Sequence, residues 1–171
     1  MREWIPVPGS AKARLIEAAL HHFEETGFEA AAVADLAAKA GVTTGALYHH
    51  FGSKLGLYAT VRADLEKRIT DRMAGAAEGA GESGGQAVRA ALVIGFDAAV
   101  RFNACRLLGE LHPHYQPDPI RNILVTLVPE RIEPAADVLA AAWRAALLAV
   151  ADGAPVESGR AALEFALAPQ R

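Results

Sequence analysis

Apolar residues recur at intervals of three to four positions along most of this chain, the spacing that places side chains on one face of an α-helix. In the first third, residues with capping or helix-breaking character divide the pattern into three short helices and the start of a long fourth one. The predicted boundaries are the N-cap Ser10, a helix end at Gly27, a second helix end at Gly41, the N-cap Thr43, a break at Gly52-Ser53 and a fourth helix starting near Lys54.

The remainder of the chain shows the same helical spacing, interrupted by turns. Five glycines among residues 75–85 predict a linker or turn, and three prolines and two histidines among residues 112–119 predict a loop. Helices are expected over the stripe from Val88 to Val100, over residues 120–128 and over residues 156–168. A seven-residue apolar repeat is typical of helix-on-helix packing, and its members are Ile132, Ala136, Leu139, Trp143, Ala146 and Val150.

Composition supports an all-α fold. The 171 residues include 38 alanines and only six threonines, an excess of the best helix former that argues against a sandwich or barrel. No apolar run approaches the roughly 18 residues of a membrane span, and residues 1–10 lack the apolar core of a signal peptide. The single Cys105 excludes an internal disulfide and a Cys-rich zinc site. We therefore expect a soluble, cytoplasmic protein with no membrane partner.

Charge alone gives no indication of nucleic-acid binding. The net charge of the chain is −3. Residues 1–54 hold five basic and six acidic side chains, so this segment carries one net negative charge. The basic patch that typically marks a DNA-binding protein is absent from these totals. A prediction of DNA binding must therefore rest on the pattern and placement of particular residues.

Residues 33–51, VADLAAKAGVTTGALYHHF, read as a helix-turn-helix. In this motif the first helix braces the second, which presents its N-terminal residues to the DNA major groove. With Leu47 and Phe51 facing inward, several residues of the second helix and its start face outward. Gly45 would let the backbone approach DNA, and His49 and Thr44 are candidates for base contacts. The residues predicted to bind DNA are Thr43, Thr44, Gly45, Tyr48, His49 and Lys54, with Thr43, Tyr48 and Lys54 expected on phosphates.

The segment from Arg14 to Thr60 resembles the N-terminal domain of the tetracycline-repressor (TetR) family of bacterial transcription regulators. Three motifs carry the resemblance: an aromatic and glycine pattern at the end of the first helix, an apolar and alanine pattern in the second, and the recognition-helix pattern itself. The matching residues are Phe23, Gly27 and Phe28; Val33, Leu36, Ala37, Ala40, Gly41 and Val42; and Thr43, Gly45, Leu47, Tyr48, His50, Phe51, Ser53 and Lys54.

The resemblance implies an all-α, ligand-responsive regulator. Residues 1–54 would form a three-helix DNA-binding head, joined by the long fourth helix to an effector-binding and dimerisation bundle over residues 55–171. The expected partners are a near-palindromic double-stranded DNA operator, a small apolar effector, and a second copy of the chain. We place the dimer interface on the Trp143 repeat and residues 156–168. Candidates for lining the effector pocket are Phe96, Phe102, Leu107 and Trp143.

Three residues depart from the family pattern. Position 32 is usually Thr or Ser and here is Ala32, which removes a helix cap worth about 1 kcal/mol and a phosphate contact. Ala46 stands where Thr is frequent, and Leu55 stands where Glu is usual. Affinity for DNA is therefore expected to be modest, or to depend on Arg2, Lys12 and Lys54.

Other residues have plainer interpretations. His50 is expected to pack or cap within the head, and Cys105 to be a small core residue. His112, His114 and Tyr115 lack a third ligand at a fixed spacing, so neither a metal nor a cofactor is predicted.

The sequence also lacks a phosphate-binding loop, a nucleophile elbow or a paired helical metal motif, so an enzyme is not expected. The alternative function is an interaction module that keeps the fold but binds operator DNA weakly or not at all.

Overall fold

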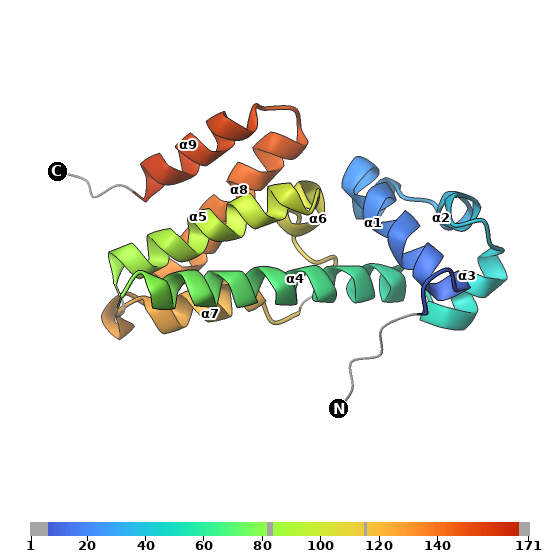
Figure 1. Cartoon of the computed structure of the whole chain (residues 1–171), viewed down its shortest axis with the longest axis horizontal. Coiled ribbons are helices and arrows are strands. Elements are labelled where there is room, and N and C mark those ends of the chain that lie inside the picture. The colour runs from blue at the N-terminus through green and yellow to red at the C-terminus, as the bar shows by residue number, and fades with distance from the viewer. Residues whose placement is uncertain (1–6, 82–83, 115, 168–171) are drawn as a thin grey trace. The chain divides into compact units, whose positions relative to one another are not determined.

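A computed structural model describes residues 7–81, 84–114 and 116–167, and Figure 1 shows this part of the chain as helices joined by turns. No strand occurs in the described ranges, as the all-α prediction required. The helices are α1 (Ala11–Ala30), α2 (Val33–Lys39), α3 (Thr44–Phe51), α4 (Lys54–Gly79), α5 (Gly85–Arg101), α6 (Cys105–Gly109), α7 (Pro119–Leu127), α8 (Ala135–Ala151) and α9 (Val156–Ala166), with a 3₁₀ turn η1 at Glu130–Ile132.

The chain divides into two compact units, Met1–Asp64 and Leu65–Arg171, which we call the head and the bundle. The division falls inside α4, ten residues later than the boundary predicted after residue 54. The reason is that Leu57, Tyr58 and Val61, on the first turns of α4, are buried with the helices of the head. Helix α4 therefore supplies side chains to both cores.

Two caps predicted from the sequence start the helices of the head. The Ser10 hydroxyl accepts a hydrogen bond from the Ala13 N–H at 3.2 Å, and the Thr43 hydroxyl accepts one from the Ala46 N–H at 3.2 Å. Gly27 has φ 76° and interrupts α1 at the predicted position, although a further helical turn continues to Ala30. A left-handed φ of this kind favours glycine, because it has no Cβ.

An aromatic cluster fills the core of the head. The rings of Phe23 and Tyr58 meet edge to face, with centroids 5.0 Å apart, and Phe28 lies 4.9 Å from Tyr58. Around them Leu15 and Leu36 are fully buried. The rings join α1 to α4, and α3 packs on both α1 and α2.

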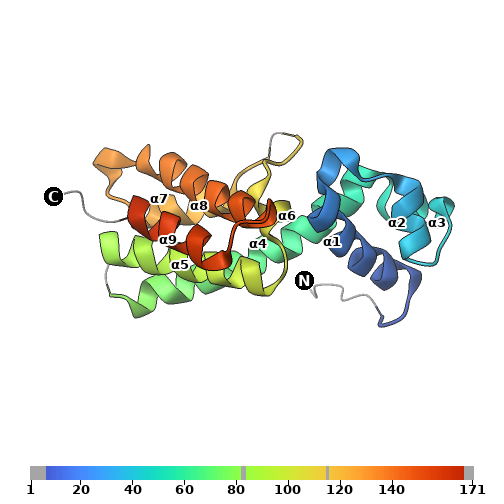
Figure 2. The ribbon, with the colours of Figure 1, turned by 90° about the horizontal axis from the view of Figure 1, so that it is seen from above.

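The bundle is built around Trp143, which is 0% exposed. Helix α9 packs on α5 and α8, as Figure 2 shows. Glycines allow the helices to approach closely: a Cβ placed on Gly95 of α5 would lie 2.9 Å from Met73 Cγ of α4, and one on Gly159 of α9 would lie 2.7 Å from Val150 Cγ2 of α8. Replacing Gly95 would displace the Met73 side chain, whereas replacing Gly159 would press on Val150 and on the backbone of α8.

The glycine-rich stretch is less of a linker than predicted. Helix α4 continues to Gly79 and α5 begins at Gly85, so residues predicted as a turn at both ends of this stretch are helical. Buried Met73 and Ala77 hold the last turns of α4 against the core, and this packing outweighs the poor helix propensity of Gly75. Glycine count alone overestimated the length of the turn.

Arginine–aspartate pairs tie the helices of the bundle together. Arg144 of α8 is mostly buried, and its Nη2 lies 2.7 Å from Oδ2 of Asp118, the N-cap of α7. Arg121 of α7 reaches Asp137 of α8 at 2.7 Å. The pKa of Arg121 is raised by its hydrogen bond to Asp137, with a further hydrogen bond to Glu133 acting in the same direction. No helix among the described residues has the length and apolar character needed to cross a membrane.

Candidate nucleic-acid interface and effector groove

Helices α2 and α3 and the turn between them form the predicted helix-turn-helix. Gly41 has φ 63°, and the backbone N–H groups of Gly41 and Val42 bond to the carbonyls of Ala38 and Ala37, both at 3.0 Å. These bonds close a tight turn of the kind that glycine permits. Buried Leu36 and Leu47 face the interior of the head on either side of the turn. The second helix is therefore fixed by its inner face, and its outer face is free of other elements of the head.

The N-terminal end of α3 is exposed as predicted. Thr43, Thr44, Gly45 and His49 are all exposed, and the side chain of Tyr48 is 51% exposed. A Cβ added to Gly45 would meet no atom closer than the Thr43 hydroxyl at 3.7 Å, so packing within the head does not require glycine there. The bare backbone at Gly45 leaves room for another molecule to approach.

Lys54 lies apart from this exposed group. Its Nζ donates to the carbonyl oxygens of Phe28 at 2.8 Å and Ala31 at 3.0 Å, and lies 4.4 Å from the centre of the Phe28 ring. The ammonium thus caps the end of α1, where helix carbonyls lack intrahelical partners. Sequence reasoning missed this role, although a lysine at the start of one helix and an aromatic at the end of another are compatible with it. Phosphate contact by Lys54 stays a prediction.

His50 differs from its interpretation as a residue that packs or caps within the head, whereas Ala32 lacks a side-chain cap as the sequence predicts. His50 is exposed and not packed inside the head, because α3 has only eight residues and Leu47 is its fully buried side chain. Ala32 occupies the N-cap of α2 with extended backbone, φ −91° and ψ 141°, but has no side chain to accept a hydrogen bond. Arg2 lies outside the described residues.

The proposed pocket residues do not meet at an open cavity. Phe96, Leu107 and Trp143 are each 0% exposed and pack within the core of the bundle, and Phe102 lies under the guanidinium of Arg72 at 4.7 Å. The Trp143 indole N–H is buried without a hydrogen-bond partner. Three of the six members of the Trp143 repeat, Ala136, Trp143 and Ala146, pack inside their own chain, which corrects their predicted place in a dimer interface.

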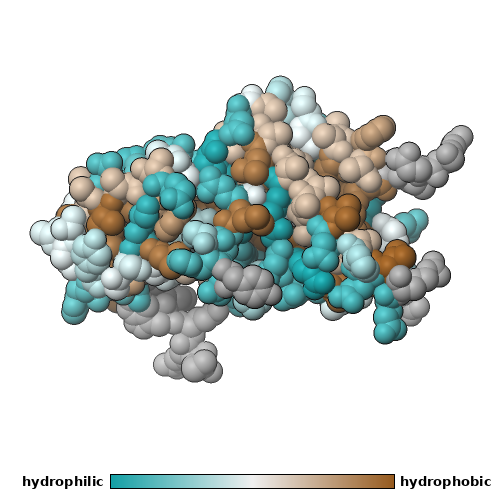
Figure 3. Space-filling model, turned by 180° about the vertical axis from the view of Figure 1, so that it is seen from behind, coloured by the Kyte–Doolittle hydropathy of each residue, from teal (hydrophilic) through white to brown (hydrophobic). Residues whose placement is uncertain are grey.

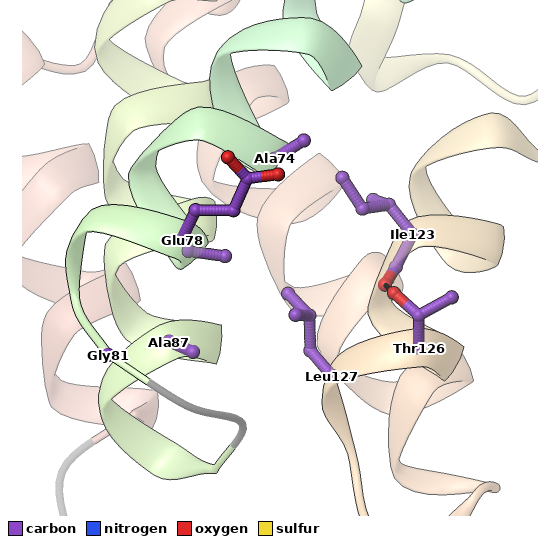
Figure 4. A pocket seen from close by; sticks show the side chains of 8 residues that line it. Ala74, Glu78, Gly81, Ala87, Ile123, Thr126 and Leu127 are labelled. Atoms are coloured by element: carbon purple, nitrogen blue, oxygen red, sulfur yellow. Dashed lines mark hydrogen bonds between the residues drawn. The ribbon is translucent and has the colours of Figure 1, made fainter.

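An open groove of about 390 Å³ lies elsewhere in the bundle. Figure 4 shows side chains of α4 on one side of it and side chains of α7 on the other, with the carboxylate of Glu78 at its edge. The lining residues are Ala74, Ala77, Glu78, Gly81, Ala87, Ile123, Thr126 and Leu127. Thr126 donates its hydroxyl hydrogen to the Ile123 carbonyl at 2.7 Å, so the surface of the groove is mainly apolar with one carboxylate. The apolar spacing of Ile123 and Leu127 was the available sequence signal.

The histidines of the loop after α6 and the single cysteine lie outside both the predicted DNA-binding surface and the groove. The His112 ring nitrogen Nδ1 lies 2.8 Å from the carbonyl of His114, within the loop, and Tyr115 lies outside the described residues. Cys105 is 5% exposed in α6, which agrees with its interpretation as a small core residue.

Comparison with known proteins matches the head to a sequence family. Residues 15–61 fit the family profile "Bacterial regulatory proteins, tetR family". A helix-turn-helix-type transcriptional regulator BetI from Paraburkholderia phytofirmans is 38% identical over 90 residues, which cover 51% of this chain and 45% of that protein. The chain therefore matches less than half the length of this curated relative.

Solved structures extend the fold similarity over nearly the whole chain. A TetR-like transcriptional regulator from Rhodococcus sp. RHA1 superposes with a TM-score of 0.62 at 22% identity, covering 96% of each chain. The fatty acid degradation regulator FadR from Bacillus halodurans gives 0.66 at 13% identity, covering 97% of this chain and 99% of that one. Identities this low show a shared fold and nothing more.

The helix-turn-helix geometry of residues 33–51 and the matched profile define the class of the head, a DNA-binding domain of a bacterial regulatory protein. Residues 15–61 are thus similar to the TetR-family DNA-binding domain, and the chain as a whole shares the all-helical fold of solved TetR-like regulators.

Proposed function

We propose that this chain is a ligand-responsive transcriptional regulator of the bacterial cytoplasm. It binds a near-palindromic operator as a homodimer, represses transcription, and is released from DNA by a small effector. The observation that carries this proposal is the TetR-family head with Thr44, Gly45, Tyr48 and His49 exposed together on α3.

The exposed N-terminus of α3 supports contact with DNA. Backbone N–H groups at a helix start favour phosphate, and side chains on the first turns of a recognition helix reach base edges in the major groove. Thr43 and Tyr48 would contact phosphates, and Thr44 and His49 would contact bases. Lys54 would act mainly by holding the end of α1 in place, since its ammonium is bonded to backbone carbonyls there.

Homodimerisation is supported by an apolar face on α8 and α9. Val138 is 69% exposed and Phe165 is 75% exposed, although both are large apolar side chains. Figure 3 shows apolar residues gathered over this part of the molecule, at the upper right of the view. Exposed alanines on the same helices would let a second copy approach closely, and they are Ala141, Ala145, Ala149, Ala161, Ala162 and Ala166. This outer face replaces the Trp143 repeat as the proposed interface.

The oligomeric state tests this surface. Val138→Glu combined with Phe165→Glu places two carboxylates in the proposed interface and should convert a dimer to a monomer in sedimentation velocity. The control is Leu111→Glu, which changes another exposed apolar residue, 77% exposed, on the loop after α6. A wild-type monomer, or a dimer that survives both glutamates, would contradict the proposed interface.

The groove between α4 and α7 is the proposed effector site. Its volume is within the range of small-molecule sites, about 300–1,000 Å³. Its apolar walls favour an apolar ligand, and Glu78, its one charged lining residue, disfavours an anion. We therefore expect neutral or cationic apolar molecules to bind more tightly than anionic molecules of the same size.

Matched ligands can test this expectation. Octanol, octylammonium and octanoate share an apolar chain and differ in charge, so the first two should raise the melting temperature of the protein more than octanoate does. Glu78→Gln should reduce the disadvantage of octanoate, and Ile123→Trp should abolish the shifts caused by octanol and octylammonium, because the indole fills the groove. Shifts that persist in Ile123→Trp would place the ligand elsewhere.

Selection of bound duplexes from a random DNA pool, at about physiological salt, tests the function as a whole. A dimer with two recognition helices should enrich a near-palindrome with half-sites one helical turn, or a multiple of one, apart. Thr44→Ala and His49→Ala should each relax preference at particular base positions, whereas Tyr48→Phe should weaken binding to all sequences. No enrichment by folded dimer would favour the alternative, an interaction module of this fold.

A further inference from the structure

One polar group in the core of the bundle has no partner. Trp143 is 0% exposed, and its indole N–H donates to no acceptor within the described part of the chain. A buried donor that has lost its bond to water and gained none in return costs free energy, so native structures rarely leave one unpaired without a reason. An indole N–H can only donate, so a molecule that satisfies it must bring an acceptor atom.

The indole nitrogen borders a space over Gly95 of α5 that a flexible side chain fills. A Cβ built on Gly95 would lie 3.5 Å from Trp143 Nε1, and 2.9 Å and 3.0 Å from Cγ and Sδ of Met73. Glycine therefore contributes no side chain to this space, and the thioether of Met73, from α4, occupies it. Met73 is 0% exposed, but its unbranched side chain rotates about three bonds and repacks more easily than a branched one.

Small residues lead from the open groove to this space. On α4, Ala77 lines the groove, and Met73 lies one turn earlier on the same face of the helix. On α5, Ala87 lines the groove (Figure 4), and the buried residues Ala91 and Gly95 follow at intervals of one turn. The side chain of Met73 therefore stands between the groove and the indole N–H.

We propose that Met73 is a movable plug, and that its displacement extends the groove inward to the Trp143 N–H, which donates to a neutral oxygen at the leading end of an elongated apolar ligand. The inference rests on the proposed effector site and adds the class of ligand, a ketone, ester or ether. A carboxylate is disfavoured, because burying a charge costs far more than burying a carbonyl and Glu78 stands at the edge of the groove. Such a ligand selects the conformation in which Met73 has moved aside.

Two probes of the same shape test the hydrogen bond. Hexyl methyl ketone carries an acceptor oxygen, and the hydrocarbon in which a methylene group replaces that oxygen carries none. In isothermal titration calorimetry the wild-type protein should bind the ketone about threefold to tenfold more tightly, the ratio expected for one net hydrogen bond. Trp143→Phe keeps an aromatic ring but removes the N–H, so the two probes should bind this variant with equal affinity.

A second pair of variants tests the plug. Met73→Ala removes the side chain that separates the groove from the indole, so affinity for the ketone should rise at least about threefold, because the extension no longer has to be opened. Leu163→Ala is the matched control: Leu163 is 2% exposed on α9 and is not among the residues that line the groove. It also loses a buried apolar side chain, but its affinity for the ketone should stay within about twofold of wild type. Equal gains in the two variants would contradict the role of Met73.

Nuclear magnetic resonance reads the indole directly and needs no substitution in the core. The chain has two tryptophans, so Trp4→Phe leaves the Trp143 indole as a single side-chain signal in a proton–nitrogen correlation spectrum. Its proton should move downfield when the ketone saturates the protein, and should not do so with the hydrocarbon.

The outcomes separate this inference from the proposed function. Equal affinity of the wild type for both probes, or an indole proton that does not move downfield under saturating ketone, overturns the extension and leaves the effector groove standing, provided that Ile123→Trp abolishes binding. Absence of binding by either probe to folded protein, or binding that survives in Ile123→Trp, overturns the proposed effector groove together with its extension.

Discussion

In the head, the aromatic rings of Phe23, Phe28 and Tyr58 fill the core. Polar contacts fix the helix ends, for example the hydrogen bond from the Lys54 ammonium to the Phe28 carbonyl at the end of α1. In the bundle, small residues bring the helices close together around Trp143, and arginine–aspartate pairs join α7 to α8, one of them through the mostly buried Arg144. The head thus depends on particular side chains at particular positions. The bundle depends on volume and spacing, which many sequences can provide.

This difference explains where the family can be recognised. The residues of the head must form its core and also present an exposed surface to DNA. Because both requirements restrict which residues can stand at each position, residues 15–61 match the family profile. The bundle needs a packed core, and the whole chain, with the bundle included, shares its fold with solved structures at identities of 13–22%. Fold therefore persists in the bundle where sequence motifs do not.

The substitution with the largest expected effect on stability lies at the centre of the bundle, and it tests whether the bundle depends on core volume. Trp143→Ala removes a fully buried side chain and leaves a cavity, so the free energy of unfolding should fall by about 3–5 kcal/mol in urea titrations. The control is Val138→Ala, on the exposed face of the same helix, which should change the free energy by less than about 0.5 kcal/mol before any effect on association. Equal effects of the two substitutions would contradict a core centred on Trp143.

A second test addresses the polar contacts of the head. Lys54→Met keeps an apolar stem but removes the donors to the Phe28 and Ala31 carbonyls, so the head should lose about 1–2 kcal/mol. Lys67→Met is the matched control, since Lys67 makes an exposed pair with Asp71 one helical turn away, worth about 0.5 kcal/mol or less. If Lys54→Met left stability unchanged and weakened DNA binding, the role of Lys54 would be the predicted phosphate contact and not the support of the end of α1.

A third change should strengthen the head. Ala32 already has the extended backbone of an N-cap, so Ala32→Ser supplies the missing acceptor and should stabilise the protein by about 0.5–1 kcal/mol. Ala38→Ser, on the exposed side of α2 beyond its first turn, introduces the same hydroxyl where the helix N–H groups are already bonded, and should be neutral or slightly destabilising. Both are measured by thermal melting, and similar effects would show that α2 does not use position 32 as its cap.

The smallest expected effect concerns the pair between α1 and α2. A hydrogen bond from Lys39 lowers the pKa of the Glu25 carboxyl below its ordinary value of 4.5. A lowered folded-state pKa means that the stabilisation is present above the ordinary value and is lost as pH falls through the lowered one. At pH 7 the melting temperature of the wild type should be slightly higher than that of Glu25→Gln. This difference should disappear in more acid solution, because the Glu25 carboxylate is then protonated. High salt should reduce it, because the pair is exposed.

The local features of the fold could be predicted because their causes are local. Ser10 and Thr43 are helix caps whose partners lie three residues away, and both appear where the sequence places them. The exposed end of α3 follows from the same helical spacing. Gly75 shows the limit, because burial of Met73 and Ala77 keeps it helical against its own propensity.

Features that depend on distant segments could not be predicted. The groove joins Ala74 and Ile123, which are brought together only by the packing of α4 against α7. The Trp143 repeat indicated a helix packed on helices, but periodicity cannot say whether those helices belong to the same chain or to a partner. Lys54 likewise bonds to backbone carbonyls, which every residue carries and no sequence pattern marks.

The unpartnered indole N–H of Trp143 also has an optical consequence. An indole shielded from water and from hydrogen bonds fluoresces at shorter wavelength than one in solvent, and this chain has just two tryptophans, Trp4 and Trp143. With Trp4 replaced by phenylalanine, the emission would come from the centre of the bundle alone. The protein would then carry an intrinsic reporter in the unit proposed to bind the effector, readable without any label.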